Sequence, residues 1–146
     1  MYQTFFECKA QFDKTMENGL VKRVTESYLT EAGSVGEAEK IFVEQLTPYM
    51  TGDFDVSSVV KKKYVDVFRQ DENDCADKWY KARLRFITLD EKSGKEKETK
   101  ADYLIQASDF YDAYRQLNEG MKGSMMDYSI VSLIETAYMD VFFYGE

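Results

Sequence analysis

The chain has 146 residues, of which 44% are hydrophobic, 15% aromatic and 32% charged, a composition typical of a globular protein rather than a disordered one. Its formal net charge of −8 disfavours nonspecific binding to nucleic acid and to anionic membranes, because an acidic surface repels both. The sequence contains no histidine, which excludes Ser-His and Cys-His nucleophile pairs and histidine-ligated zinc.

The N-terminal part of the chain predicts a β-hairpin. Apolar and polar side chains alternate over residues 5–12, as in a half-buried strand. Asn18 and Gly19 then predict a type I′ turn, since both residues tolerate positive φ. A second strand over 20–30 should return antiparallel to the first.

A helix and a long strand are expected next. Ser34, followed three residues later by Glu37, has the form of a capping box and predicts the start of the helix. Pro48 should end it, because proline cannot continue a helix. The β-branched run over 54–68 predicts a strand that is bent or bulged near the lysines at 61–63. The order is β-β-α-β.

The same order begins again after residue 78. Residues 80–86 alternate as residues 6–12 do, 74 positions earlier, and the Ser-Gly pair at 93–94 predicts the second hairpin turn. Ser108 or Asp109 is expected to cap a second helix.

Gly120 is a natural end for that second helix. The last strand, over 127–142, repeats the stretch 53–68, since six of 16 positions are identical. Such periodicity predicts a duplicated unit.

The fold class predicted is α+β: an internally duplicated β-β-α-β unit with pseudo-twofold symmetry, six antiparallel-rich strands and two helices. The chain would be a single domain made of two repeats, 1–68 and 79–146, joined by the solvated linker 69–78. Whether the six strands form one sheet or two stays open.

Three pairs of polar residues recur at matched positions of the two closing strands: Ser58 and Ser132, Tyr64 and Tyr138, and Asp66 and Asp140. Two carboxylates brought close together could serve acid–base chemistry or bind a divalent cation. The alternative is structural, since a tyrosine and an aspartate two positions apart on a strand share one face and decorate it. We favour the structural interpretation, and the four Tyr and Asp residues stay as candidate ligand-binding positions.

A second candidate is an aromatic and cationic strip, which has the right chemistry to stack a base and neutralise a phosphate. The alternative is an ordinary ion-paired strand face, because a turn at 93–94 would place Arg85 opposite Asp102. We favour that alternative, and the strip stays as the second set of candidate ligand-binding residues: Trp79, Lys81, Arg83 and Arg85.

Other sites of known chemistry are missing from the sequence. The acidic stretch 71–82 superficially resembles a calcium loop, but Ala76 stands where that loop needs glycine and Ala82 where it needs glutamate. Neither standard glycine-rich phosphate loop occurs, and Cys8 and Cys75 alone cannot bind zinc. No metal, no cofactor, no signal peptide and no membrane span is expected, so a cytoplasmic location is the simplest expectation.

Seven segments also carry a resemblance: "FFECK", "KTMENG", "KWYK", "FITLDEKSGKEK", "QASDF", "EGMKG" and "YSIVSLIETAYMDVF". Together they resemble a small domain family of unknown function found in Bacteroidetes-type bacteria and their phages. The resemblance covers essentially the whole chain. It implies a bacterial host cell or a phage as the source, and it brings no catalytic residue.

The leading functional hypothesis is a non-enzymatic binding protein that sequesters a small anionic, nucleotide-like ligand. In a phage that ligand could be a host defence signal. The alternative is a protein-interaction or structural module, either a homo-oligomer or an acidic inhibitor that binds a protein partner. An enzyme is the third hypothesis, and it would depend on carboxylate or tyrosine chemistry.

Overall fold

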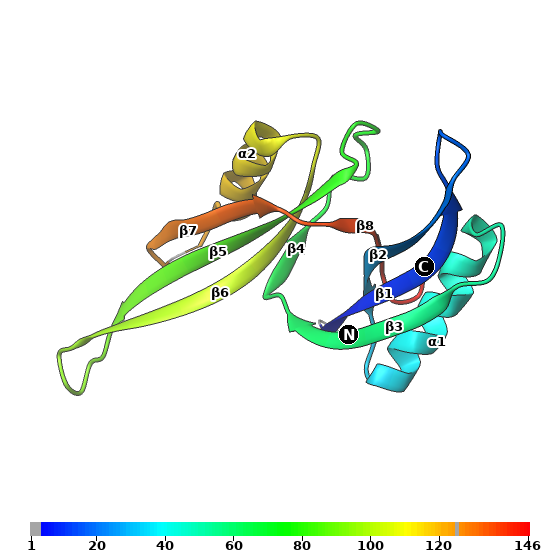
Figure 1. Ribbon diagram of the computed structural model, residues 1–146. Helices are drawn as coiled ribbons and strands as arrows, with labels where there is room; N and C mark the ends of the chain where they lie inside the picture. Colours follow the sequence, from blue (N-terminus) through cyan, green and yellow to red (C-terminus); the bar gives the residue numbers. More distant parts are fainter. Residues whose placement is uncertain (1–3, 125) are drawn as a thin grey trace. The chain divides into compact units, whose positions relative to one another are not determined.

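The computed structural model of the protein describes residues 4–124 and 126–146, which form two α-helices, one short 3₁₀ helix and eight strands (Figure 1). The chain divides into two compact units. Unit 1 contains the described residues up to Lys63 together with Ala137–Glu146, and unit 2 contains Tyr64–Thr136. The fold is α+β, as the sequence predicts, and its strands form two sheets, one in each unit.

Unit 1 is a mixed sheet with one helix on one of its faces (Figure 1). Its strand order is β3-β1-β2-β8, and only β8 is parallel to its neighbour. Alternate residues of the first strand pack under the apolar stripe of the helix, as their spacing predicts. The elements are β1 (Thr4–Thr15), β2 (Val21–Glu31), α1 (Val35–Leu46), the 3₁₀ helix η1 (Thr47–Tyr49), β3 (Asp55–Lys63) and β8 (Tyr138–Phe142).

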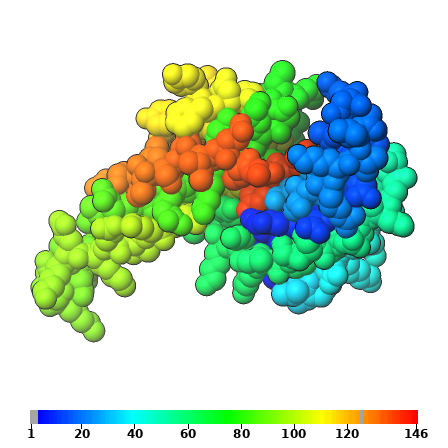
Figure 2. Space-filling view, viewed as in Figure 1, coloured from blue at the N-terminus to red at the C-terminus, as the bar shows by residue number. Residues whose placement is uncertain are grey.

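Unit 2 repeats this arrangement with its own core. Its strand order is β7-β5-β6-β4, with β4 parallel to β6 and the other pairs antiparallel. The hairpin tip between β5 and β6 projects beyond the body of the unit (Figures 1 and 2). The elements are β4 (Asp66–Phe68), β5 (Lys78–Leu89), β6 (Glu96–Ala107), α2 (Phe110–Gly120) and β7 (Tyr128–Glu135).

Each closing stretch of the sequence is divided between the two units. The first forms β3 in unit 1 and then β4 in unit 2, while the second forms β7 in unit 2 and then β8 in unit 1. The pairing of β4 with β6 corresponds to the pairing of β8 with β2. Val67 lies opposite Leu104 in the first pair of strands, and Val141 lies opposite Leu29 in the second. The prediction of six strands is therefore wrong: there are eight in the described chain, because each closing stretch changes sheet partway along.

The first hairpin forms as predicted, but its turn type is different. Thr15 and Val21 are the last pair of the β1–β2 ladder, so the loop is longer than two residues. Gly19 has a φ of 83°, whereas no described non-glycine residue has a positive φ. Asn18 instead accepts a hydrogen bond from the N–H of Leu20 through its side chain, at 3.1 Å. A type I′ turn, which needs two consecutive positive φ angles, is therefore excluded.

The first closing stretch is bent at Val65, just after the lysines at 61–63 where a bend or bulge is predicted, whereas the bulges of both closing stretches lie elsewhere. The register of β3 on β1 shifts at Ser57, and the register of β7 on β5 shifts at Val131. These two positions are 74 residues apart, the same offset that relates the two closing stretches. The bulge therefore lies in the middle of each ladder.

Both helices begin where the sequence predicts. The Ser34 hydroxyl accepts a hydrogen bond from the N–H of Glu37 at 3.2 Å, and the Asp109 carboxylate accepts one from the N–H of Asp112 at 2.8 Å. Of the two residues considered for the second cap, Asp109 is the one in the N-cap position. Each cap satisfies an N–H that the first helical turn leaves without a partner.

Gly120 is the last residue of α2, and a glycine is required there by space rather than by backbone conformation. Its φ is not among the positive values of the described glycines. A Cβ built at this position would lie only 2.7 Å from the ring of Phe68, the last residue of β4. Helix α2 and β4 thus approach each other closely at a point where only glycine fits.

We expect Gly120→Ala to lower the free energy of unfolding by about 1–3 kcal/mol, because the Phe68 ring must move away from a packed position. Gly36→Ala is the matched control, since Gly36 lies in α1 with no atom within 4 Å of a new Cβ. The control should be neutral or slightly stabilising, as alanine favours helix over glycine. Urea unfolding of both variants measures the difference, and equal stabilities would contradict the close approach.

Candidate functional site

The cationic strip predicted on β5 is present, but its cations already have partners. The Arg83 guanidinium donates to Asp102 at 2.9 Å, and the Lys81 ammonium lies 3.6 Å from the same carboxylate. Arg85 donates to the hydroxyl of Ser129 at 3.3 Å. Burial alone would raise the pKa of Asp102, but Arg83 and Lys81 outweigh that effect and lower it. The strip is thus an ion-paired strand face, the alternative that the sequence favours.

The pairing differs from the predicted one in register. Arg83, not Arg85, lies opposite Asp102 on β6. The hairpin is centred on Lys92 and Ser93 rather than on Ser93 and Gly94, since Leu89 pairs with Glu96. Each residue of β5 therefore lies opposite a residue of β6 two positions earlier than predicted, and Arg85 lies opposite Lys100.

The aromatic member of the strip is not accessible. Trp79 is buried, with 5% of its surface exposed. A ligand base would need an open ring face for stacking. The strip therefore offers partly exposed cations without an accessible aromatic platform. Ion pairs of this exposed kind contribute only about 0–1 kcal/mol each.

The repeated carboxylates do not form a pair within either unit. Asp66 belongs to unit 2 at the start of β4, and Asp140 belongs to unit 1 within β8. Each accepts a hydrogen bond at 2.8 Å from the N–H of the residue that follows it. Burial raises the pKa of Asp140, although the hydrogen bond from Val141 works in the opposite direction.

The repeated tyrosines and serines also belong to the strands. Tyr138 opens β8 and donates from its hydroxyl to the carboxylate of Glu7 at 3.1 Å. Tyr64, the first residue of unit 2, is buried, and Ser58 and Ser132 lie in the ladders of β3 and β7. These positions fit the structural interpretation of the repeated residues.

A buried polar cluster at Asp112 ties the predicted linker 69–78 to unit 2. The Asp112 carboxylate accepts hydrogen bonds from the side chain of Gln70 and from the backbone N–H of Ser108, both at 2.9 Å. Arg115 donates to its other oxygen at 2.9 Å. Burial alone would raise the pKa of Asp112, but these donors outweigh it and hold the pKa far below its ordinary range.

We expect the protein to lose stability in acid through Asp112. Because its pKa is lower in the folded than in the unfolded chain, the stabilisation is complete above the ordinary aspartate pKa of about 4 and is lost as the pH falls below that value. Unfolding by urea between neutral pH and pH 2.5 measures this loss. Asp112→Asn removes the titrating group, so this variant should show a shallower acid dependence than the wild type, and an unchanged slope would contradict the assignment.

The site with the geometry of a binding pocket lies at the end of α1 in unit 1. The helix ends at Leu46, and Pro48 lies in η1 just beyond it, so the far end of the sheet face is left uncovered by the helix. A groove of about 390 Å³ opens there. It is lined by Phe12, Asp13, Lys14, Thr15, Glu26, Tyr28, Leu46, Tyr49, Met50, Thr51, Gly52 and Asp53.

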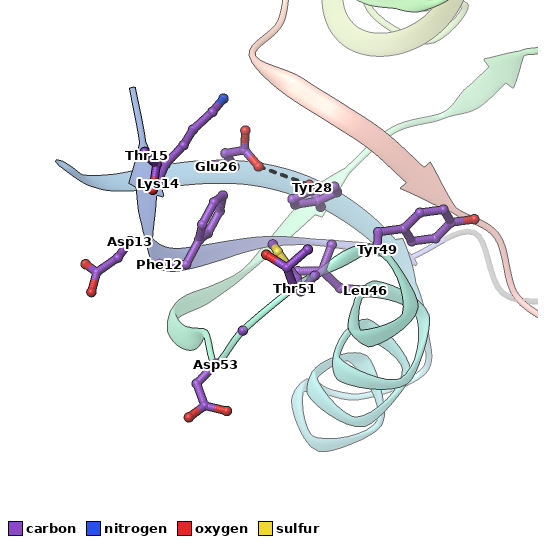
Figure 3. Close-up of a pocket in the computed structure, with 12 residues that line it drawn as sticks. Phe12, Asp13, Lys14, Thr15, Glu26, Tyr28, Leu46, Tyr49, Thr51 and Asp53 are labelled. Carbon is purple, nitrogen blue, oxygen red and sulfur yellow. Dashed lines mark hydrogen bonds between the residues drawn. The ribbon is translucent and has the colours of Figure 1, made fainter. Parts of the chain in front are cut away.

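The apolar and the charged side chains that line the groove lie on different parts of its surface. Figure 3 shows the rings of Phe12 and Tyr28 with Leu46 along the wall, while the carboxylates of Asp13 and Asp53 point away from them. The walls come from β1, β2, the end of α1 and the loop before β3. The groove is therefore built by three segments of unit 1: residues 12–15, residues 26–28 and residues 46–53. The first two belong to the paired strands β1 and β2.

One hydrogen-bonded pair lies inside the groove. The Tyr28 hydroxyl donates to Glu26 at 3.3 Å (Figure 3). Burial, together with the nearby carboxylates Glu26 and Asp140, raises the pKa of Tyr28 to about 12. At neutral pH the phenol keeps its proton, and the pair can accept hydrogen bonds from a ligand through the remaining lone pairs of Glu26.

At the position of unit 2 that corresponds to the groove, two aromatic rings pack against each other. The predicted offset of 74 matches Phe12 with Phe86, and the Phe86 ring packs against Tyr128 with centroids 6.3 Å apart. The residue of unit 1 that matches Tyr128 is Phe54, which packs against Phe42 in the core instead. Phe12 thus stays half-buried beside the groove, while Phe86 is 8% exposed.

The described residues contain no group of three or more Cys, Asp and Glu side chains placed to hold a metal ion. Burial raises the pKa of the Cys8 thiol to about 11, so at neutral pH it is not a thiolate. Within the described ranges, no helix has the length and apolar character needed to cross a membrane.

The profile of a domain of unknown function, DUF4494, matches residues 4–144. The chain belongs to the DUF4494 family. No curated protein and no solved structure matches the chain. The function of this DUF4494 chain is therefore inferred from the geometry of its own residues.

The groove could not be recognised in the sequence of this DUF4494 chain. Its walls are ordinary strand and helix residues, and the segments that meet there lie as far apart as β1 and the loop after η1. The one available signal was Pro48, which marks the end of the helix before the end of the sheet. The Asp112 cluster was also missed, because Gln70 lies 42 residues away in a stretch rich in polar side chains.

Proposed function

We propose that this DUF4494 protein is a non-enzymatic binding protein that holds a small amphipathic ligand in the groove of unit 1. The observation that carries the proposal is the uncovered end of the sheet face beyond α1, where apolar and polar side chains in similar share line a groove of about 390 Å³. Concave sites of this size are typical of small-molecule binding, and their polar groups fix the orientation of the ligand.

The lining suggests how a ligand would lie. Its apolar body would contact Phe12 and Tyr28, and its hydrogen-bond donors would reach Glu26, whose one internal partner in the described structure is the Tyr28 hydroxyl. Lys14 stands at the same end of β1 and makes no ion pair within 4 Å among the described residues. Polar groups placed in this way fix orientation, while the apolar walls supply most of the affinity.

The chemistry of the Tyr28–Glu26 pair favours binding over catalysis. With a pKa of about 12, Tyr28 is a poor proton acceptor or donor at neutral pH. The pair is therefore suited to present an acceptor to a ligand rather than to shuttle a proton.

Thermal unfolding of the full chain against a panel of nucleotides, nucleosides, amines and amino acids tests this proposal. A true ligand should raise the unfolding temperature of the wild type, and Tyr49→Ala and Glu26→Gln should each reduce that increase. Tyr49 is 77% exposed, so its replacement leaves the core intact. Leu89→Ala, at a residue of unit 2 that is 67% exposed, is the control. Equal responses from all variants would overturn the site.

The biological source and the cellular location of the protein are part of the same proposal. A bacterial or phage source and a cytoplasmic location are consistent with an acidic chain that has few cysteines. The anionic, nucleotide-like ligand expected from the sequence stays a prediction, which the nucleotides of the panel test. The paired cations of the β5 strip give it no added support.

A second candidate, a protein-interaction module, is favoured by one observation. Helix α2 carries three aromatic residues on its outward side: Phe110, Tyr111 and Tyr114, which are 49%, 81% and 50% exposed. Figure 2 shows the atoms of this helix, in yellow, at the surface of the molecule. Aromatic residues are enriched in protein interfaces. A heavier particle in light scattering that reverts to a monomer in Tyr111→Ala would support this candidate.

A further inference from the structure

A second hollow continues the groove at its β8 end. It has a volume of about 230 Å³ and shares Tyr28, Leu46 and Tyr49 with the groove. Its remaining lining comes from β8: Met139, Asp140 and Phe142. A ligand that fills the groove can therefore extend one end into this hollow without leaving unit 1.

The hollow combines aromatic rings with a carboxylate. The rings of Tyr28 and Phe142 are nearly parallel, with centroids 5.7 Å apart, and Tyr49 supplies a third, largely exposed ring. Aromatic faces carry negative potential and attract cations, most strongly where water is partly excluded. Because the rings of Tyr28 and Phe142 are buried and stack on each other, Tyr49 is the ring whose face is open to a positively charged group.

The carboxylate in the hollow lacks a counter-ion. Asp140 accepts one hydrogen bond, from the N–H of Val141 at 2.8 Å, and no described cation lies within 4 Å of it. Asp140 is exposed as a residue, and partial desolvation of its carboxylate raises its pKa. Glu26 also has no ion pair in the described chain, so the field along the groove is negative and Lys14 only partly offsets it.

The few hydrogen-bond acceptors in the hollow limit which type of cationic group it can bind. A guanidinium has five N–H donors and a primary ammonium three, and each buried donor needs an acceptor. The side-chain oxygen acceptors that line the hollow are the carboxylate of Asp140 and the phenol oxygens of Tyr28 and Tyr49. An alkylated ammonium has few or no N–H groups to satisfy, so it fits this lining best.

We infer that the hollow formed by Tyr28, Tyr49, Phe142 and Asp140 binds an alkylated ammonium group. The ligand of this protein is then an amphipathic cation, in place of the anionic, nucleotide-like ligand expected from the sequence, and its apolar body lies in the adjoining groove. The inference rests on the proposed binding function and specifies the chemical class of its ligand. It also gives β8 a role, because two of the four residues come from the C-terminal strand that completes unit 1.

Isothermal titration of the full chain with choline and with 3,3-dimethylbutan-1-ol tests the inference. The two probes have the same shape, and only choline is charged. Choline should bind about tenfold more tightly than the alcohol, as expected for a cation against aromatic faces. Asp140→Asn and Tyr49→Ala should each reduce that ratio severalfold, while Leu89→Ala, at an exposed residue of unit 2, should leave it unchanged.

The outcomes separate the two proposals. Equal affinity for both probes would overturn the ammonium site but leave the groove as a binding site. If neither probe binds while a compound of the panel does, the ammonium site is also overturned and the binding function stands. If no compound binds at all, both proposals fail. Thermal unfolding of Asp140→Asn alone verifies that the variant is folded.

Discussion

Replacing Phe142 by alanine is expected to lower the free energy of unfolding of unit 1 by about 3–5 kcal/mol. The Phe142 ring stacks on Tyr28 and lies 6.3 Å from Phe42, within the buried core that α1 covers. Its removal takes away apolar contact and leaves a cavity that the strands around it can only partly close. Urea unfolding measures the total loss.

Hydrogen exchange shows where that loss falls. Although Phe142 comes from the second half of the sequence, it packs in unit 1, so amides of β1 and β2 should exchange faster. Met139→Ala, on the same strand but 55% exposed, is the matched control and should change stability by less than about 0.5 kcal/mol. Faster exchange in β5 and β6 with β1 and β2 unchanged would contradict the division of the closing strands.

Replacing Asp112 by alanine is expected to cost about 2–4 kcal/mol, because buried donors on Gln70 and Ser108 lose their acceptor. Asp112 is 3% exposed, so water does not readily replace the carboxylate. The predicted linker should loosen from unit 2 and become more susceptible to limited proteolysis. Chemical denaturation combined with a protease digest measures both effects.

Glu119→Ala is the control for this prediction. Glu119 lies on the same helix and pairs with Lys122, but the pair is exposed and should contribute no more than about 1 kcal/mol. A double-mutant cycle of Asp112→Ala with Gln70→Ala isolates the coupling across the cluster. A loss in Asp112→Ala no larger than that in Glu119→Ala would show that the cluster does not hold the linker.

Local features of the fold could be predicted from the sequence. The hairpins, both helix starts and the inward side of β1 and β5 follow from alternation and from capping residues such as Ser34 and Asp109. Each of these depends on a few neighbouring side chains. The turn type at Asn18 and the register of Arg83 were wrong, because they depend on the full geometry of the loop.

Features of the fold that depend on contacts between residues far apart in the sequence could not be predicted from local patterns. Both closing stretches read as single long strands, and nothing in their composition marks the change of sheet after Lys63 or after Thr136. The groove depends on where α1 stops relative to the sheet. Among the candidate site residues, only Asp140 lines the hollow beside the groove, whereas Trp79 is buried and Arg83 is ion-paired.

The most direct test of the binding site is amide NMR of the isotope-labelled full chain during titration with benzyltrimethylammonium, which has both an aromatic body and a quaternary ammonium. We predict that the largest shift changes fall on residues 12–15, 49–53 and 139–142, the segments that line the groove and its second hollow. Asp140→Asn should weaken those changes. Shift changes confined to β5, or none at all, would contradict the binding site.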